Sequence, residues 1–216
     1  MKNIVCLISG RGSNLEAILN AQRDQDWPGS LDARVAAVIS NRADARGLAI
    51  AQARGVPTCV VAHDSYDSRG AFDSALAQRI DEHAPDLVVL AGFLRVLTPE
   101  FVERYRGRLI NIHPSLLPAF MGLGTHARAI EAGVRIHGTT VHYVSGELDA
   151  GPIIAQAALA VRPGESESEL ARRVLSLEHR LLPRCIAWIL EGRVRWDGKR
   201  VHTDDLGMQD LLLQEP

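Results

Sequence analysis

The sequence has few cysteines, no long apolar run and almost no net charge. Its three cysteines, Cys6, Cys59 and Cys185, are widely spaced and form no CxxC pair; this argues against a disulfide or zinc framework and is typical of a reducing compartment. Because no apolar stretch is long enough for a signal peptide or a membrane span, we expect a cytoplasmic protein without membrane association. The 24 basic and 26 acidic residues give a formal charge of −2, which does not indicate nucleic-acid binding.

Apolar segments alternate with helical patterns in the first half of the 216-residue chain. This alternation predicts right-handed βαβ units and an α/β fold with a doubly wound, mostly parallel sheet. The expected strands of this half are Asn3–Ile8, Val35–Ile39, Thr58–Val61, Leu87–Leu90 and Leu109–Ile112. The expected helices cover about residues 14–23, 45–54 and 68–83, and a short helix begins with Thr98 as its N-cap and Pro99 at its first position.

The pattern changes after residue 112. Two strand-like runs, Thr139–Val144 and Pro152–Leu159, are separated only by a loop, which predicts an antiparallel C-terminal extension of the sheet. A long helix is expected over about residues 168–190. Its apolar stripe consists of Leu170, Val174, Leu177 and Leu181. We expect a single domain over residues 1–200, and the poorly patterned tail, residues 201–216, stays unplaced.

A glycine-containing loop, Ser9–Asn14, joins the first expected strand to the first helix, with Ser13 and Glu16 spaced as a capping box. Glycines let the backbone approach an anion, and the amides at a helix N-terminus bind phosphate. The GxGxxG pattern is incomplete, because Leu15 occupies the third glycine position and no acidic residue ends the second strand. We therefore predict a site for a single phosphate, with a simple tight turn as the alternative.

Two polar residues, Asn111 and His113, stand at the end of the expected strand Leu109–Ile112. They are two positions apart and so point to the same side, at the strand end where open α/β sheets bind substrates. Downstream, Asp149 supplies a carboxylate that can orient the imidazole and favour its protonated form. An amide, an imidazole and a carboxylate suit acyl transfer to an amine. A core histidine and a turn-forming aspartate are the structural alternatives.

Other charged and imidazole side chains have simpler interpretations. Arg69 and Arg95 are expected to be solvated charges, and Glu178 to be an exposed carboxylate of the long helix. Four histidines are interpreted as structural hydrogen-bonding groups, because their spacing predicts no metal site: His126, His137, His142 and His179.

Five segments of the chain resemble the phosphoribosylglycinamide formyltransferases, folate-dependent enzymes of purine synthesis: Ile4–Leu15, Ala91–Leu97, Asn111–Pro118, His137–Asp149 and Glu178-His179. The run Asn-Ile-His-Pro-Ser-Leu-Leu-Pro is specific to formyl-folate transferases and hydrolases, and Ser-Gly-Arg-Gly-Ser-Asn narrows the resemblance to this branch. The resemblance covers about residues 1–192. It implies a Rossmann-like formyltransferase fold, with phosphate binding in the N-terminal half and folate binding in the C-terminal half.

The resemblance also implies an activity and a set of site residues. The formyl group of 10-formyltetrahydrofolate passes to the amine of 5-phosphoribosylglycinamide, without a metal and in a monomer or homodimer. Asn111 is then an oxyanion donor, His113 the general acid and a second oxyanion donor, and Asp149 the group that orients His113. The implied nucleotide-binding residues are Gly12, Ser13, Asn14 and Glu178. The implied folate-binding residues are Arg69, Leu94, Arg95, Val96, Leu97, Asn111, Ser145, Gly146, Glu147, Leu148 and Asp149.

The chain departs from the family pattern at Met121, Gly124 and Gly146, which affects expected substrate affinity rather than the chemistry. Three alternatives remain. A formyltetrahydrofolate hydrolase is expected to carry an additional N-terminal regulatory domain, whereas the first strand here is expected at residue 3. A methionyl-tRNA formyltransferase is expected to be basic, with a C-terminal RNA-binding domain. A non-catalytic nucleotide-binding module explains the glycine-containing loop but not Asn111, His113 and Asp149.

Overall fold

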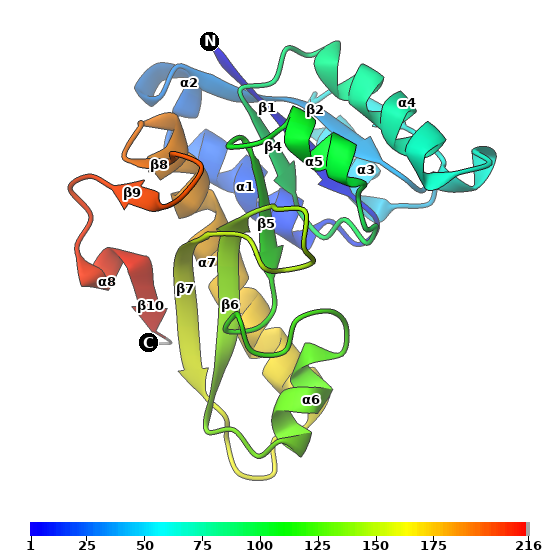
Figure 1. Cartoon of the computed structure of the whole chain (residues 1–216). Coiled ribbons are helices and arrows are strands. Elements are labelled where there is room, and N and C mark those ends of the chain that lie inside the picture. Colours follow the sequence, from blue (N-terminus) through cyan, green and yellow to red (C-terminus); the bar gives the residue numbers. More distant parts are fainter. Residues whose placement is uncertain (215–216) are drawn as a thin grey trace. The chain divides into compact units, whose positions relative to one another are not determined.

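The computed structural model of the protein describes residues 1–214 (Figure 1). The chain forms two compact units: the first ends at Ile110 and the second begins at Asn111. Strand β5 (Leu109–His113) begins in the last two residues of the first unit and ends in the second. The two units are described in turn.

The first unit contains four parallel strands in the order β4-β1-β2-β3. Strand β1 is fully buried from Ile4 to Ile8, as expected for a strand covered on both faces. The four strands fall where the sequence predicts them, with ends that differ by at most two residues: β1 (Lys2–Ile8), β2 (Ala33–Ser40), β3 (Thr58–Val60) and β4 (Leu87–Leu90).

Helices of the first unit pack in pairs, α1 against α3 and α4 against α5. Ser68 caps α4 through its hydroxyl group. Thr98 caps α5 in the same way and Pro99 occupies its first turn, and both are as predicted. The helical segments are α1 (Ser13–Asp24), α2 (Trp27–Ser30), α3 (Arg46–Ala53), the 3₁₀ turn η1 (His63–Ser65), α4 (Arg69–Asp81) and α5 (Pro99–Arg104).

The predicted capping box of α1 is wrong. The N-cap is Gly12 in the left-handed region (φ 80°), and Ser13 is the first helical residue. A Ser13 hydroxyl one position inside the helix is no longer placed as an N-cap acceptor for the first turn. Gly12 as the N-cap residue provides no side-chain hydrogen bond to the first turn of α1.

The second unit contains strands in the order β10-β7-β6-β5. Strands β6 (Ile136–Tyr143) and β7 (Ile153–Ala160) are antiparallel, which confirms the predicted extension, and β10 (Leu212–Gln214) runs parallel to β7. Gly138 is needed in β6, because a Cβ there would lie 1.9 Å from the Ala157 carbonyl oxygen. A separate hairpin joins β8 (Val194–Trp196) to β9 (Val201–Thr203).

The long helix α7 (Glu167–Leu190) packs against β6 and β7 in this unit. It begins with a complete capping box formed by Ser166 and Glu169. All four leucine and valine residues of the predicted stripe are buried. The two other helices are α6 (Thr125–Glu131) and α8 (Met208–Leu211).

The tail that the sequence left unplaced forms β9, α8 and β10, and its residues 215–216 lie outside the described residues. Among the helices of residues 1–214, none combines the length and apolarity needed to cross a membrane.

Candidate active site

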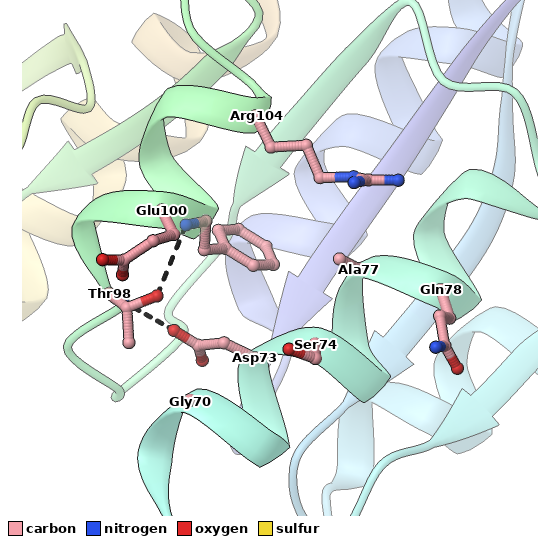
Figure 2. A pocket seen from close by; sticks show the side chains of 9 residues that line it. Gly70, Asp73, Ser74, Ala77, Gln78, Thr98, Glu100 and Arg104 are labelled. Carbon is pink, nitrogen blue, oxygen red and sulfur yellow. Dashed lines mark hydrogen bonds between the residues drawn. The ribbon is translucent and has the colours of Figure 1, made fainter.

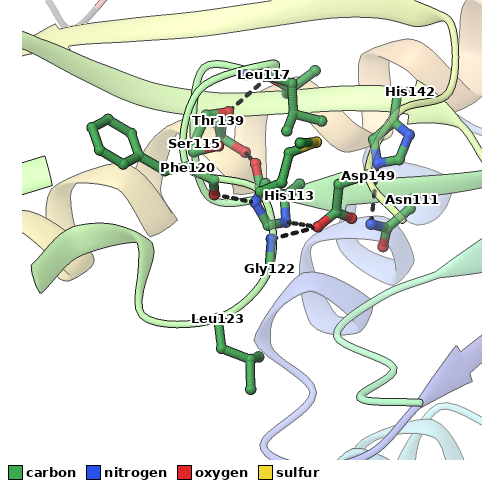
Figure 3. Close-up of polar contacts among 12 residues, drawn as sticks. Asn111, His113, Ser115, Leu117, Phe120, Gly122, Leu123, Thr139, His142 and Asp149 are labelled. Atoms are coloured by element: carbon green, nitrogen blue, oxygen red, sulfur yellow. Dashed lines mark hydrogen bonds and ion pairs between the residues drawn. The ribbon is translucent and has the colours of Figure 1, made fainter. Parts of the chain in front are cut away.

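Strand β5 ends in the second unit with Asn111 and His113, which Figure 3 shows together with Asp149. His113 is buried and Asn111 half-buried at the end of this otherwise apolar strand. Hydroxyl groups of β6 fix the turn that follows: Thr139 Oγ1 donates to the His113 carbonyl at 2.8 Å and Thr140 Oγ1 donates to the Ser115 carbonyl at 2.7 Å. The backbone that carries His113 is therefore held by buried hydrogen bonds.

Both ring nitrogens of His113 face acceptors. Nε2 donates to the Phe120 carbonyl oxygen at 3.0 Å, and Nδ1 lies 3.4 Å from Asp149 Oδ2. Because a carbonyl oxygen only accepts, Nε2 is the protonated nitrogen of that contact, and the Asp149 carboxylate lies beside Nδ1. The two side chains are 8% and 9% exposed, so the imidazole and the carboxylate face each other away from bulk water.

Asp149 also connects two loops of the second unit. Its Oδ2 accepts a hydrogen bond from the Gly122 amide at 2.8 Å, and its backbone has a left-handed φ of 51°. The following turn requires Gly151, because a Cβ there would lie 1.7 Å from the Tyr143 carbonyl oxygen. Phe120 likewise has φ 56°, a conformation uncommon for an aromatic residue. These constrained residues direct the Asp149 carboxylate and the Phe120 carbonyl at the same imidazole.

His142 orients the Asn111 amide. His142 Nδ1 donates to the Tyr143 carbonyl at 2.9 Å, so its Nε2 accepts from Asn111 Nδ2 at 3.2 Å. Burial lowers the pKa of His142, which keeps this ring neutral and its Nε2 available as an acceptor. Asn111 retains a second N–H, which can donate to a substrate oxygen. From the sequence, His142 is interpreted as a structural residue. Its position near the end of the expected strand could have indicated a place in the site.

His126 and His137 form a second histidine pair, with His126 Nδ1 3.2 Å from His137 Nε2. Burial lowers the pKa of both, that of His137 to about 4, and this favours two neutral rings. The pair fits the structural interpretation of these residues. Within residues 1–214, no group of three His, Cys, Asp or Glu side chains could hold a metal ion.

The predicted phosphate loop lies in the first unit. A Cβ on Gly12 would stand 2.5 Å from Gly47 Cα, so the close approach of two backbones requires glycine there. The Gly47 amide donates to the Gly10 carbonyl at 3.1 Å and fixes the loop against α3. Ser13 and Asn14 form the first turn of α1, where the helix dipole and the backbone amides favour an anion.

The predicted folate-binding segment Leu94–Leu97 also belongs to the first unit and connects β4 to α5. Leu94 is 73% exposed and Val96 54% exposed. The Arg95 guanidinium lies over the Phe72 ring, 5.9 Å from its centroid, rather than extending freely into solvent. Arg69 is exposed at the first position of α4.

The remaining predicted contacts lie in the second unit. Ser145–Asp149 is a loop between β6 and β7, with Gly146, Glu147 and Leu148 exposed. Glu178 is buried, so its interpretation as an exposed carboxylate is wrong. It directly follows the buried Leu177 and lies on the covered face of α7, a position that the stripe of leucines indicated.

The chain is similar to known proteins along most of its length. The chain is 48% identical over 206 residues to the phosphoribosylglycinamide formyltransferase of Escherichia coli K12, covering 92% of this chain and 95% of that protein. It is 42% identical over 192 residues to the human trifunctional purine biosynthetic protein adenosine-3, covering 89% of this chain and 19% of that protein. The phosphoribosylglycinamide formyltransferase structure from Coxiella burnetii, solved in complex with CHES, has a TM-score of 0.89 and 45% identity, covering 100% of this chain and 99% of that one.

The profile of the formyl transferase family matches residues 2–186, a span that includes Asn111, His113 and Asp149. This span is more than half of the chain, and the relatives match over nearly their whole length in both bacteria. The resemblance seen in the sequence motifs is thereby confirmed: the chain belongs to the formyl transferase family.

Proposed function

We propose that this enzyme transfers the formyl group of 10-formyltetrahydrofolate to the amine of 5-phosphoribosylglycinamide, in purine biosynthesis. The observation that carries the proposal is the buried His113, held between the Asp149 carboxylate and the Phe120 carbonyl beside the Asn111 amide. The names of the Escherichia coli and Coxiella burnetii relatives support the choice of substrate. The products are formyl-phosphoribosylglycinamide and tetrahydrofolate.

Asn111 and His113 stabilise the developing oxyanion in this mechanism. The substrate amine attacks the formyl carbon, and the carbonyl oxygen gains negative charge as the new C–N bond forms. The second N–H of Asn111 donates to this oxygen, since the first is taken by His142. Loss of one such donor typically costs about 10²–10³ in rate.

His113 then supplies a proton to the folate nitrogen as the bond from N10 to the formyl carbon breaks. The imidazole that has given up this proton takes up the proton that the attacking amine loses, directly or through water, so the transfer is proton-neutral overall. Asp149 is assigned the role of orienting the imidazole and stabilising positive charge on it during this step. Because Nε2 donates to the Phe120 carbonyl, the reacting substrate has to replace that carbonyl as its partner. General acid catalysis of this kind contributes about 10²–10⁴ in rate.

Water is the competing nucleophile. We assign the loop Ser145–Asp149 to shielding the site from it. Two of the three cysteines are poor nucleophiles, because Cys6 and Cys185 are buried and burial raises the pKa of the Cys6 thiol to about 12; the third, Cys59, lies on β3 of the first unit.

Gly12, Ser13, Asn14 and Glu178 are proposed to bind the nucleotide substrate. The left-handed Gly12 and the first turn of α1 support phosphate binding by Ser13 and Asn14. Glu178 supplies a carboxylate for a ribose hydroxyl or the amine, and its burial limits competition from water.

The folate is proposed to contact the first unit through Arg69 and Leu94, Arg95, Val96 and Leu97. In the second unit it contacts Asn111 and the loop residues Ser145, Gly146, Glu147, Leu148 and Asp149. Exposed apolar side chains at Leu94, Val96 and Leu148 support these contacts, because a pterin ring buries apolar surface. We further propose a cytoplasmic monomer or homodimer that acts on small molecules without a metal.

The test is a spectrophotometric assay of the purified protein with 10-formyltetrahydrofolate, with and without 5-phosphoribosylglycinamide. We expect deformylation only when the nucleotide is present. Folate turnover without the nucleotide would indicate the hydrolase, and the absence of any turnover would indicate a non-catalytic binding module.

A further inference from the structure

The segment Leu94–Thr98 has no regular secondary structure, yet both of its ends are held by buried side chains of the first unit. Two of its side chains are exposed, Leu94 at 73% and Val96 at 54%. Its two anchors, Ser9 and Asp73, are only 4% and 3% exposed. An exposed loop whose backbone is fixed by buried side chains is suited to present its own side chains to a ligand.

The first anchor is the Ser9 hydroxyl at the carboxyl end of β1. Ser9 Oγ accepts a hydrogen bond from the Leu94 amide at 2.8 Å and donates to Asn41 Oδ1 at 2.6 Å. Asn41 is itself buried and its Nδ2 lies 3.2 Å from His63 Nδ1. The hydroxyl therefore uses its proton and a lone pair, and its rotation is fixed.

The second anchor is Asp73 on α4. Its Oδ2 accepts from the Thr98 amide at 2.6 Å, as Figure 2 shows, where the chain leaves the segment and enters α5. Burial raises the pKa of Asp73, while the hydrogen bond with Thr98 and the charges of Arg69 and Arg95 act in the opposite direction. Asp73 thus lies within the influence of both arginines that are proposed to contact the folate.

A third contact lies between the anchors. The Arg95 guanidinium packs over Phe72, the residue that precedes Asp73 on α4. The N-terminal half of α4 therefore holds the segment by one hydrogen bond and one cation–π contact, while β1 holds its other end.

We propose that Ser9 and Asp73 are positioning residues for the formyl donor, which hold Leu94–Thr98 in the conformation that binds the folate. The inference rests on the proposed function, because that function assigns Leu94, Arg95, Val96 and Leu97 to the folate. Neither anchor touches the reacting atoms. Each orders the segment before the folate binds. Binding then carries no entropic cost for ordering the segment, and the affinity for the folate is higher.

The central test compares Asp73→Ala with Asp73→Asn, because the asparagine side chain keeps an oxygen acceptor for the Thr98 amide. We expect Asp73→Ala to raise the KM for 10-formyltetrahydrofolate about ten-fold, the equivalent of one lost hydrogen bond. The KM for 5-phosphoribosylglycinamide should change less than about two-fold, and Asp73→Asn should restore most of the folate affinity. An equal rise in both variants would overturn the acceptor role.

Asp81→Ala is the matched control for Asp73. Asp81 lies on the same helix and also connects α4 to α5, through Arg104 and the Tyr105 hydroxyl, but it has no contact with the segment among the described residues. It should lower stability without raising the folate KM. If Asp81→Ala raises that KM as much as Asp73→Ala does, the effect comes from general loosening of the helix pair and the proposal is wrong.

Ser9→Ala tests the other anchor, with Ser40→Ala as its control. Ser40 is a buried serine at the carboxyl end of the neighbouring strand β2, and its hydroxyl bonds to the Arg42 carbonyl instead. We expect Ser9→Ala, but not Ser40→Ala, to speed amide hydrogen exchange of residues 93–98 and to raise the folate KM.

Hydrogen exchange distinguishes a failure of the anchoring from a failure of the proposed function. If the wild-type protein has no transferase activity, the proposed function fails, yet fast exchange of residues 93–98 in Asp73→Ala would still establish the anchoring. If the wild type is active but exchange and the folate KM in Ser9→Ala and Asp73→Ala match those of the controls, the anchoring is wrong while the function stands.

Discussion

His113 and Asp149 lie side by side in the second unit, with Nδ1 of the imidazole 3.4 Å from Oδ2 of the carboxylate. They are 36 positions apart in the sequence, on β5 and on the loop after β6. The carboxylate is shared with the Gly122 amide, and the far side of the ring is held by the Phe120 carbonyl. This buried arrangement gives the imidazole a fixed orientation with a carboxylate beside it.

Replacing either partner is expected to remove most of the activity while the fold remains. His113→Ala removes the proposed acid, and Asp149→Asn leaves an amide that cannot balance the imidazolium charge. Each should reduce kcat by about 10²–10⁴. Steady-state kinetics and thermal unfolding of the purified variants measure the two effects, and near-wild-type turnover in either variant would refute the assignment.

The nucleotide site is tested by Asn14→Ala in the first turn of α1. The substitution removes the buried Asn14 side chain next to the expected phosphate but leaves the folate contacts in place. The KM for 5-phosphoribosylglycinamide should rise about ten-fold or more, with a much smaller change for the folate. A similar rise for both substrates would mean that the phosphate does not bind at this loop.

His142 is expected to act through Asn111. His142→Phe keeps the shape of the side chain but removes the acceptor at Nε2, so the amide loses its fixed orientation. We expect kcat to fall about ten-fold, with little change in either KM. The double variant with Asn111→Ala provides the check: if His142 works by orienting that amide, the two losses should not add.

His137 should make stability depend on pH. Burial holds its pKa at about 4, below the ordinary value of 6.5, so the unfolded chain takes up a proton before the folded one does. This contribution is fully present above pH 6.5 and is lost as the pH falls towards 4, a change on the order of 3 kcal/mol. Urea unfolding at pH 7 and pH 5 should show a steeper loss in the wild type than in His137→Gln. Equal losses would contradict the prediction.

Local patterns in the sequence were sufficient for much of the fold. The fully buried β1 is an uninterrupted apolar run, and the stripe of α7 repeats at helical spacing, so each element follows from its own residues. The motif from Asn111 to Pro118 identified the family, and alternation along β5 put Asn111 and His113 on one side. These features depend on neighbours in the chain.

Other features could not be predicted from local patterns, because they depend on residues distant in the sequence. The α1 cap is decided by the approach of Gly12 to Gly47, which forces the left-handed turn at residue 12 and places Ser13 inside the helix. Glu178 was predicted to be exposed because charged side chains are usually solvated, but it is buried, as is its neighbour Leu177. The tail from Val201 was unpatterned because β10 gains its hydrogen bonds by pairing with β7.

The sequence by itself determined the α/β class, the boundaries of most strands and the family, because these depend on apolar periodicity and short motifs. Only the tertiary structure decided how His113 is held, that His142 orients Asn111, and that Ser9 and Asp73 anchor the segment from Leu94 to Thr98. The contact of His113 with Asp149 and the hydrogen bonds of Asn111, Ser9 and Asp73 join residues far apart in the chain. Such bonds become specific only when folding buries both partners and leaves them no water as an alternative.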